Sequence, residues 1–213
     1  MDLKEKERAG MIAEILQSEY PDSTTALVFK NPFELLVSTI LSAQCTDKQV
    51  NKITPSLFER YKSPRDFADA DLTELENMVR STGFYKNKAK NIKAASQMIA
   101  GEFSSSTPDN MDDLLKLPGV ARKTANIVLI YGFDKVEGIA VDTHVLRLSR
   151  RLGFSKSKNP KKVEQDLMEL FPENLWKRIN SILISHGRAV CTARSPSCCD
   201  CVIRDYCLSS GCE

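Results

Sequence analysis

Two helical patterns meet at the stretch LPGVARKTA, residues 117–125. A Pro-Gly turn that runs directly into an apolar helical pattern predicts a tight connection between two helices. Such a turn points backbone N–H groups outward, and the first N–H groups of a helix have no partner inside it. Together with the positive end of the helix dipole, these donors can bind one phosphate of a nucleic acid. From these residues alone, an ordinary helix–helix turn is the more frequent interpretation.

The rest of the chain carries helix signals and no strand signals. Candidate helix starts, each an N-cap residue followed by Pro or by an acid, are Asn31-Pro32, Ser63-Pro64, Asp71 with Glu74, Thr107-Pro108 and Asn159-Pro160. Helical spacing of apolar residues is clearest at Phe33, Leu36, Val37, Ile40 and Leu41. No two-residue alternation flanked by hairpin turns is present. We therefore predict an all-α protein of about ten helices.

Length and composition limit the possible classes of protein. The 213 residues can form one large or two small domains, each with an apolar core. Residues 1–8 are highly charged and unlike a signal peptide, and no apolar run approaches the ~18 residues of a membrane span. Seven cysteines, an odd number, fit a reducing compartment in which thiols are free to bind metal. We expect an intracellular, cytoplasmic monomer, associated with the nucleoid if the source is prokaryotic.

The charge distribution is uneven although the net charge is only +2. Residues 147–162 contain seven Lys and Arg residues and no acid, and a second basic cluster comprises Lys86, Lys88, Lys90 and Lys93. Basic clusters of this kind favour a polyanionic partner such as nucleic acid. Solvated helix ends give the same pattern, so the charge alone leaves both interpretations open.

Lys123, within the 117–125 stretch, and Asp142, further along the chain, have side chains that can serve covalent chemistry. Lys123 falls in the first turn of the following helix, and a lysine amine can attack a sugar C1′ and leave a Schiff base. Asp142, nineteen residues later, precedes a new helix, and its carboxylate could stabilise an oxocarbenium-like sugar and assist proton transfer. In isolation, a solvated lysine and a helix N-cap are the commoner interpretations of these two residues.

Four cysteines near the C-terminus have the spacing C-x6-C-x2-C-x5-C, at Cys191, Cys198, Cys201 and Cys207. A zinc ribbon normally shows two C-x2-C turns, whereas this segment contains one. Four thiolates are the ligand set of a [4Fe-4S] cluster, so the spacing favours an iron-sulfur cluster. Structural zinc, or cysteines that are reactive or disulfide-bonded, stay open as alternatives.

Taken together, these segments resemble the endonuclease III family of DNA base-excision repair glycosylases over nearly the whole chain. The resemblance is carried by NPFELLVSTILSAQCTDKQVN from Asn31, STGFYKNKAKNI from Ser81, LPGVARKTAN from Leu117, VDTHVLR from Val141, HGRAVC from His186, and the cysteine spacing. It implies a two-domain all-α helix-hairpin-helix fold with DNA bound in a cleft between the domains. The expected parts are a six-helix domain (24–136, with the helix-hairpin-helix at about 109–132) and a cluster domain (1–23 and 137–213, with the cluster loop at 191–207).

The resemblance also implies roles for individual residues. Lys123 would be the nucleophile and Asp142 its acidic partner, and the four cysteines above would bind a [4Fe-4S] cluster. Gln44 would fill the space left by an extruded base, and Phe84 would act as a wedge. Further DNA contacts would come from Leu117, Gly119, Ala121, Arg122, His144, Arg147, Arg188 and Arg194.

Several of these residues have plausible structural interpretations instead. Phe84 could be an ordinary core residue, Gln44 a surface amide, and His144 a histidine on a helix face. Ala121 stands where many relatives have a second hairpin glycine, so we expect this position not to need a positive φ. Cys45 is expected to be a small buried residue, and no role is predicted for Cys199 or Cys212.

The function implied by the resemblance is that of a bifunctional enzyme acting on double-stranded DNA. It would remove oxidised pyrimidines and cleave the abasic site by β-elimination through a lysine Schiff base. A monofunctional mismatch or adenine glycosylase of the same superfamily is the main alternative, and Lys123 argues against it. A non-catalytic DNA-binding protein and an iron-sulfur redox sensor are more remote, because neither would use the Lys123 and Asp142 pair.

Overall fold

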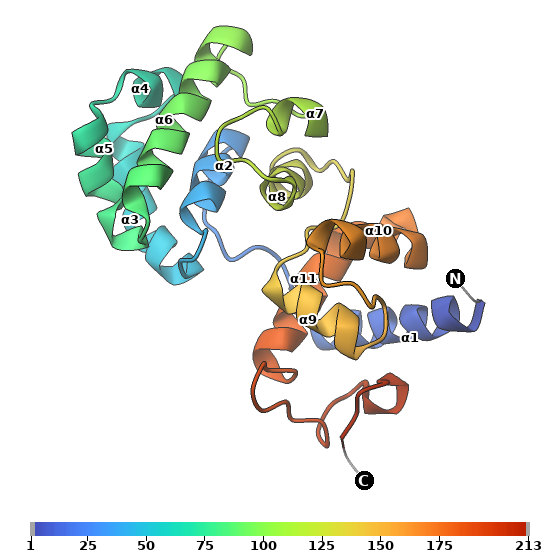
Figure 1. The fold of residues 1–213 in the computed structure, drawn as a ribbon. Coiled ribbons are helices and arrows are strands. Elements are labelled where there is room, and N and C mark those ends of the chain that lie inside the picture. Colours follow the sequence, from blue (N-terminus) through green and yellow to red (C-terminus); the bar gives the residue numbers. More distant parts are fainter. Residues whose placement is uncertain (1–2, 212–213) are drawn as a thin grey trace. The chain divides into compact units, whose positions relative to one another are not determined.

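The computed structural model describes residues 3–211, which fold into two compact units (Figure 1). One unit comprises residues 26–137, and the other comprises the N-terminal residues up to 25 together with residues from 138 onward. Within the described residues the regular structure consists of eleven α-helices and two short 3-10 helices, without a strand. The prediction of an all-α fold is confirmed. No helix in this part of the chain is long and apolar enough to span a membrane.

The unit of residues 26–137 contains seven α-helices, where we expected six. They are α2 (Pro32–Leu41), α3 (Asp47–Arg60), α4 (Pro64–Asp69), α5 (Leu72–Val79), α6 (Tyr85–Glu102), α7 (Met111–Leu114) and α8 (Arg122–Phe133), with the 3-10 helix η1 (Arg80–Thr82) between α5 and α6. The difference in number comes from short elements, because α4 has six residues and α7 has four.

Helix α2 lies at the centre of this unit. It packs against α3, α6 and α8, and its residues from 35 to 41 are all buried (Figure 1). All five residues of the predicted apolar stripe, which begins at Phe33, are buried. A helix that is apolar on nearly every face is stable only when it is enclosed by other elements, and each fully buried aliphatic or aromatic side chain contributes roughly 1.5–3 kcal/mol.

Local capping accounts for most helix starts. Asn31, Ser63, Asp71 and Asn159 each accept a hydrogen bond from a backbone N–H in the first turn of the next helix. The helix start expected at Thr107-Pro108 is wrong. Pro108 is buried, and the next helix begins only at Met111, where the Asn110 side chain accepts from the N–H of residue 113. A competing N-cap two residues beyond the proline therefore decides where α7 begins.

The second unit joins the two ends of the chain. It contains α1 (Leu3–Glu19), α9 (Thr143–Arg151), α10 (Pro160–Leu170), α11 (Glu173–Ala189) and the 3-10 helix η2 (Arg204–Tyr206). Helix α1 packs against α10 and α11 and contributes four fully buried residues to a shared core (Figure 1). The Arg8 side chain donates to the backbone oxygens of Leu152 (2.8 Å) and Tyr206 (3.0 Å). The N-terminal helix is thus bonded directly to the cysteine-rich segment.

Candidate functional site

The turn before α8 has a geometry that requires its glycine. The backbone N–H of Val120 donates to the oxygen of Leu117 (3.1 Å), Pro118 occupies the second position, and Gly119 has φ +79° at the third. Proline followed by a residue with positive φ is the pattern of a type II turn. A Cβ on Gly119 would also lie 2.8 Å from Cβ of Asn91 on α6. Gly119 therefore serves both the turn and the close approach of the turn to α6.

The first turn of α8 leaves its backbone donors uncapped and presents Lys123. Ala121 is the N-cap residue, with φ −95° and ψ 168°, and no side chain caps this helix end. The expectation that Ala121 does not need a positive φ is confirmed. Lys123 is exposed in this first turn, and Arg122 beside it is partly exposed. Uncapped N–H groups at an exposed helix N-terminus form an anion-binding arrangement.

Leu117, predicted as a DNA contact, is buried in the structure. Its side chain is only 2% exposed, its N–H donates to the oxygen of Leu114, and its own oxygen accepts from Val120. The Leu117 side chain therefore anchors the turn in the core.

Gln44 and Phe84 both have strained backbones and face solvent. Gln44 lies between α2 and α3 with φ +54°, and Phe84 immediately precedes α6 with φ +48°. Phe84 is 66% exposed, so its interpretation as a core residue is wrong. A bulky residue in the left-handed region costs of order 1–3 kcal/mol, and such strain is concentrated at functional sites.

The second basic cluster is less available to a polyanion than its sequence suggests. Lys86 and Lys90 are exposed, but Lys88 is only 5% exposed and donates to two backbone oxygens inside the unit. Lys93 is partly buried and donates to the oxygen of Ala70. Periodicity could not distinguish these lysines, because each has an acceptor more than 20 residues away along the chain, Leu41 for Lys88 and Ala70 for Lys93.

Asp142 begins α9 and acts as its N-cap. Its carboxylate accepts a hydrogen bond from the N–H of Val145 (2.8 Å). The capping interpretation is thus confirmed. His144 and Arg147 follow on the same helix, with Nη2 of Arg147 3.2 Å from Nδ1 of His144. Arg147 also donates to the backbone oxygens of Gly187 (3.0 Å) and Cys191 (3.0 Å), so part of its guanidinium serves the fold.

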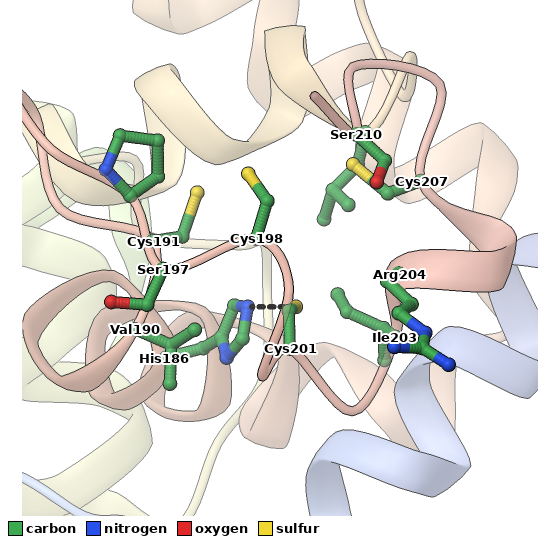
Figure 2. A pocket seen from close by; sticks show the side chains of 12 residues that line it. His186, Val190, Cys191, Ser197, Cys198, Cys201, Ile203, Arg204, Cys207 and Ser210 are labelled. Atoms are coloured by element: carbon green, nitrogen blue, oxygen red, sulfur yellow. Dashed lines mark hydrogen bonds between the residues drawn. The ribbon is translucent and has the colours of Figure 1, made fainter. Parts of the chain in front are cut away.

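The four cysteines of the C-x6-C-x2-C-x5-C spacing line one pocket (Figure 2). Apolar parts of Leu152, Val190 and Ile203 complete its wall. None of the four cysteines is disulfide-bonded, and each is partly buried. Among residues 3–211, no three His, Cys, Asp or Glu side chains converge closely enough to hold a single metal ion. The thiols therefore surround a shared space rather than one point.

A buried histidine lies against this pocket. His186 is 1% exposed, and its Nε2 lies 3.5 Å from Sγ of Cys201 (Figure 2). Its Nδ1 lies 3.2 Å from the hydroxyl of Tyr20. Burial lowers the pKa of His186 from 6.5 to about 4, so the imidazole is neutral at pH 7. Burial also raises the pKa of the Cys201 and Cys207 thiols, and a bound cation would oppose this effect by favouring thiolates.

Arg151 holds the cysteine-rich loop in place, a role that the sequence did not reveal. Its Nη1 lies 3.2 Å from Sγ of Cys191 and donates to the oxygen of Thr192 (2.7 Å), while its Nη2 donates to the oxygen of Ala193 (3.0 Å). In the basic run 147–162, Lys162 also forms an ion pair with Asp166 (2.9 Å). The run is therefore partly structural. Its exposed charges are at Arg150, Lys156, Lys158 and Lys161, together with Lys162, which is ion-paired.

The remaining site residues lie at the surface or outside the four-cysteine set. Arg188 and Arg194 are exposed, the latter within the loop between Cys191 and Cys198. Cys45 is partly buried against the core of residues 26–137 and is not disulfide-bonded. Cys199 is not among the free thiols, and Cys212 lies outside the described residues.

Comparison with known proteins places these features in a family. Residues 37–173 match the model of the HhH-GPD superfamily of base excision DNA repair proteins. The chain is 50% identical to endonuclease III of Synechocystis over 205 residues, covering 96% of this chain and 94% of that protein. It is 46% identical to endonuclease III of Bacillus subtilis, covering 88% and 86%.

Solved structures lead to the same family. A trapped endonuclease III–DNA covalent intermediate is 42% identical to this chain and superposes with a TM-score of 0.92, covering 96% of each chain. The extent of these matches, over both units and both ends of the chain, excludes a likeness limited to one domain. This chain belongs to the endonuclease III family of HhH-GPD base excision DNA repair proteins.

Proposed function

We propose that this protein is a base-excision repair enzyme that removes oxidised pyrimidines from double-stranded DNA and cleaves the resulting abasic site. The observation that carries the proposal is the exposed Lys123 in the uncapped first turn of α8. An amine at this position can bind covalently to a substrate whose phosphate is held by the same helix end. A relative 42% identical to this chain has been captured as a covalent intermediate with DNA.

The chemistry follows from the properties of an amine nucleophile. Nζ of Lys123 forms a bond to C1′ of the extruded nucleotide, and the base leaves with the electron pair of the glycosidic bond and takes up a proton. Opening of the sugar gives a Schiff base. Loss of a C2′ proton then expels the 3′ phosphate, which nicks the strand, and hydrolysis releases the enzyme. The Asp142 carboxylate would stabilise the positive charge that develops on the sugar and accept protons.

The DNA interface would use the α8 helix end and several side chains. Gly119 and Ala121 let the turn and the uncapped N–H groups approach one phosphate, next to Arg122. Exposed Arg188 and Arg194 would contact other phosphates, and His144 and the remaining donor of Arg147 would add to these contacts. Phe84 would insert between base steps, and Gln44 would occupy the space left by the extruded base.

The pocket lined by Cys191, Cys198, Cys201 and Cys207 would hold a [4Fe-4S] cluster. Four unpaired thiols around one shared space match the ligand set of the cluster. When bound, the cluster would supply a rigid covalent frame for the loop that carries Arg194.

Borohydride trapping tests the proposed function. The wild-type protein, incubated with duplex DNA that contains thymine glycol or an abasic site and reduced with borohydride, should form a stable protein–DNA adduct. The reduction converts the Schiff base into a stable amine, so the adduct reports covalent chemistry directly. A monofunctional glycosylase would release the base without forming an adduct. A non-catalytic DNA-binding protein would neither release the base nor form an adduct.

We expect Phe84→Ala to weaken binding to lesion-containing duplex by about tenfold, since stacking of an aromatic ring on a base is worth about 1–3 kcal/mol. The ring is 66% exposed, so the melting temperature should change little. Val28→Ala is the matched control, because Val28 is an apolar residue of the same unit and 68% exposed. Fluorescence anisotropy with lesion-containing and intact duplexes measures the effect. Equal lesion affinity of the two variants would exclude the wedge role.

A further inference from the structure

Lys88 is a buried cation that the proposed chemistry does not use. It lies on α6 and is 5% exposed, and its ammonium donates to the backbone oxygens of Leu41 (2.8 Å) and Thr82 (2.8 Å). No carboxylate is among these partners. A buried charge without a counter-ion is costly, so a lysine is rarely placed in this way unless its bonds hold something in place.

Both acceptors are the last residues of helices. Helix α2 ends at Leu41, and the 3-10 helix η1 ends at Thr82. Carbonyls at a helix end lack partners within the helix and carry the negative end of its dipole. The Lys88 ammonium satisfies one such carbonyl on each helix and thereby ties the two helix ends together. Burial lowers the pKa of Lys88, and the two carbonyls offset part of that desolvation cost.

Each tied helix end leads directly into a strained residue of the proposed DNA interface. Gln44, with φ +54°, follows Leu41 by three residues, and Phe84, with φ +48°, follows Thr82 by two. A backbone in the left-handed region persists only when the surrounding structure fixes it. The Lys88 bonds fix the chain at the entrance to both segments. A second bond nearer the surface joins the first turn of α3, which follows the Gln44 segment, to η1, from Nε2 of Gln49 to Oγ of Ser81 (2.7 Å).

We propose that Lys88 is a positioning residue that holds the Gln44 and Phe84 segments in the register needed to recognise a lesion. The inference rests on the proposed function in one respect, because it assumes that these two segments contact the extruded nucleotide and its gap. Lys88 itself touches no substrate. Its effect should therefore appear in discrimination between damaged and intact duplex, and not in the amine chemistry at Lys123.

Lys88→Met tests the proposal, with Lys93→Met as the matched control. Methionine keeps the length and apolar stem of the side chain but has no donor. Lys93 lies on the same helix and donates to a single backbone oxygen, that of Ala70, which belongs to neither segment. The control thus removes a lysine-to-carbonyl bond from α6 and leaves both segments tied.

Three measurements separate positioning from general stability. They are the thermal melting curve, the affinity ratio between duplex with a reduced abasic-site analogue and intact duplex, and borohydride trapping on an abasic site in single-stranded DNA. We expect Lys88→Met to lower the affinity ratio about tenfold, as loss of a hydrogen bond to a charged group commonly does. Single-strand trapping should stay within about twofold of wild type, since no base has to be extruded. Lys93→Met should match wild type in both the affinity ratio and single-strand trapping.

An unchanged affinity ratio in Lys88→Met, or a ratio lowered equally by Lys93→Met, would overturn the proposal. So would a loss of single-strand trapping by Lys88→Met well beyond the expected twofold. If Lys88→Met is too unstable to assay, Gln49→Ala removes the exposed bond between α3 and η1, which flank the Gln44 and Phe84 segments, and it should lower the affinity ratio about threefold. A wild-type affinity ratio in Gln49→Ala would count against the proposal. The affinity ratio requires no catalysis, so it tests the positioning role of Lys88 alone. Failure of the wild-type protein to form a trapped adduct would refute the proposed function, independently of that ratio.

Discussion

Lys123→Gln should abolish the borohydride-trapped adduct and reduce cleavage of abasic DNA at least about a thousandfold, because the variant has no amine to form the Schiff base. The residue is exposed in the first turn of α8, so the substitution should change the free energy of unfolding by no more than about 0.5 kcal/mol. Affinity for intact duplex should stay within a few-fold of wild type. Trapping gels and anisotropy on the same protein preparation measure both effects.

A second lysine close to the turn provides the control. Lys116 is exposed and forms an ion pair with Asp113 (2.7 Å), and Lys116→Gln should trap DNA at the wild-type rate. Adduct formation by Lys123→Gln at that same rate would show that another amine is the nucleophile.

Asp142→Asn separates the capping role of Asp142 from its charge. Asparagine is an equally good N-cap, so α9 should keep its start and its stability. The loss of the carboxylate should still slow trapping strongly. A wild-type rate would limit Asp142 to the capping bond that it makes to Val145.

Cys201→Ser should deplete the protein of iron and of its visible absorption band. Serine is a poor ligand for iron in a site of this kind, and loss of one of four thiolates leaves the cluster without its full ligand set. We expect iron to fall from about four atoms per chain to below one, with a clear drop in the melting temperature, since binding of a structural metal contributes directly to folding. Metal analysis and the absorption spectrum of anaerobically purified protein measure these effects.

Cys45→Ser is the matched control for this loss. Cys45 is also free and partly buried, but it packs against the core of residues 26–137 and does not line the pocket. The Cys45→Ser variant should keep the full iron content. Stoichiometric zinc in the wild-type protein, or full iron content in Cys201→Ser, would contradict the assignment of the pocket to the cluster.

Local signals in the sequence were sufficient to predict helix starts and buried helix faces where the interacting atoms lie within one helical turn. The caps at Asn31, Ser63 and Asp71 each join atoms three residues apart, and the buried stripe of α2 follows from spacing alone. The expectation at Thr107 failed because a second N-cap, Asn110, competes with it and Pro108 is buried. Competition of this kind is decided by packing, which a local pattern does not contain.

Residue types and spacing by themselves determined the all-α class, the helical hairpin with its lysine, and the four cysteines that line one pocket. The tertiary structure decided which basic residues are available to a partner. Lys88, counted among the basic residues that favour nucleic acid, bonds to a carbonyl 47 residues away, and Arg151 bonds to the cysteine loop about 40 residues away. Whether a long cationic side chain faces solvent or satisfies a distant helix end depends on contacts made only when the chain has folded.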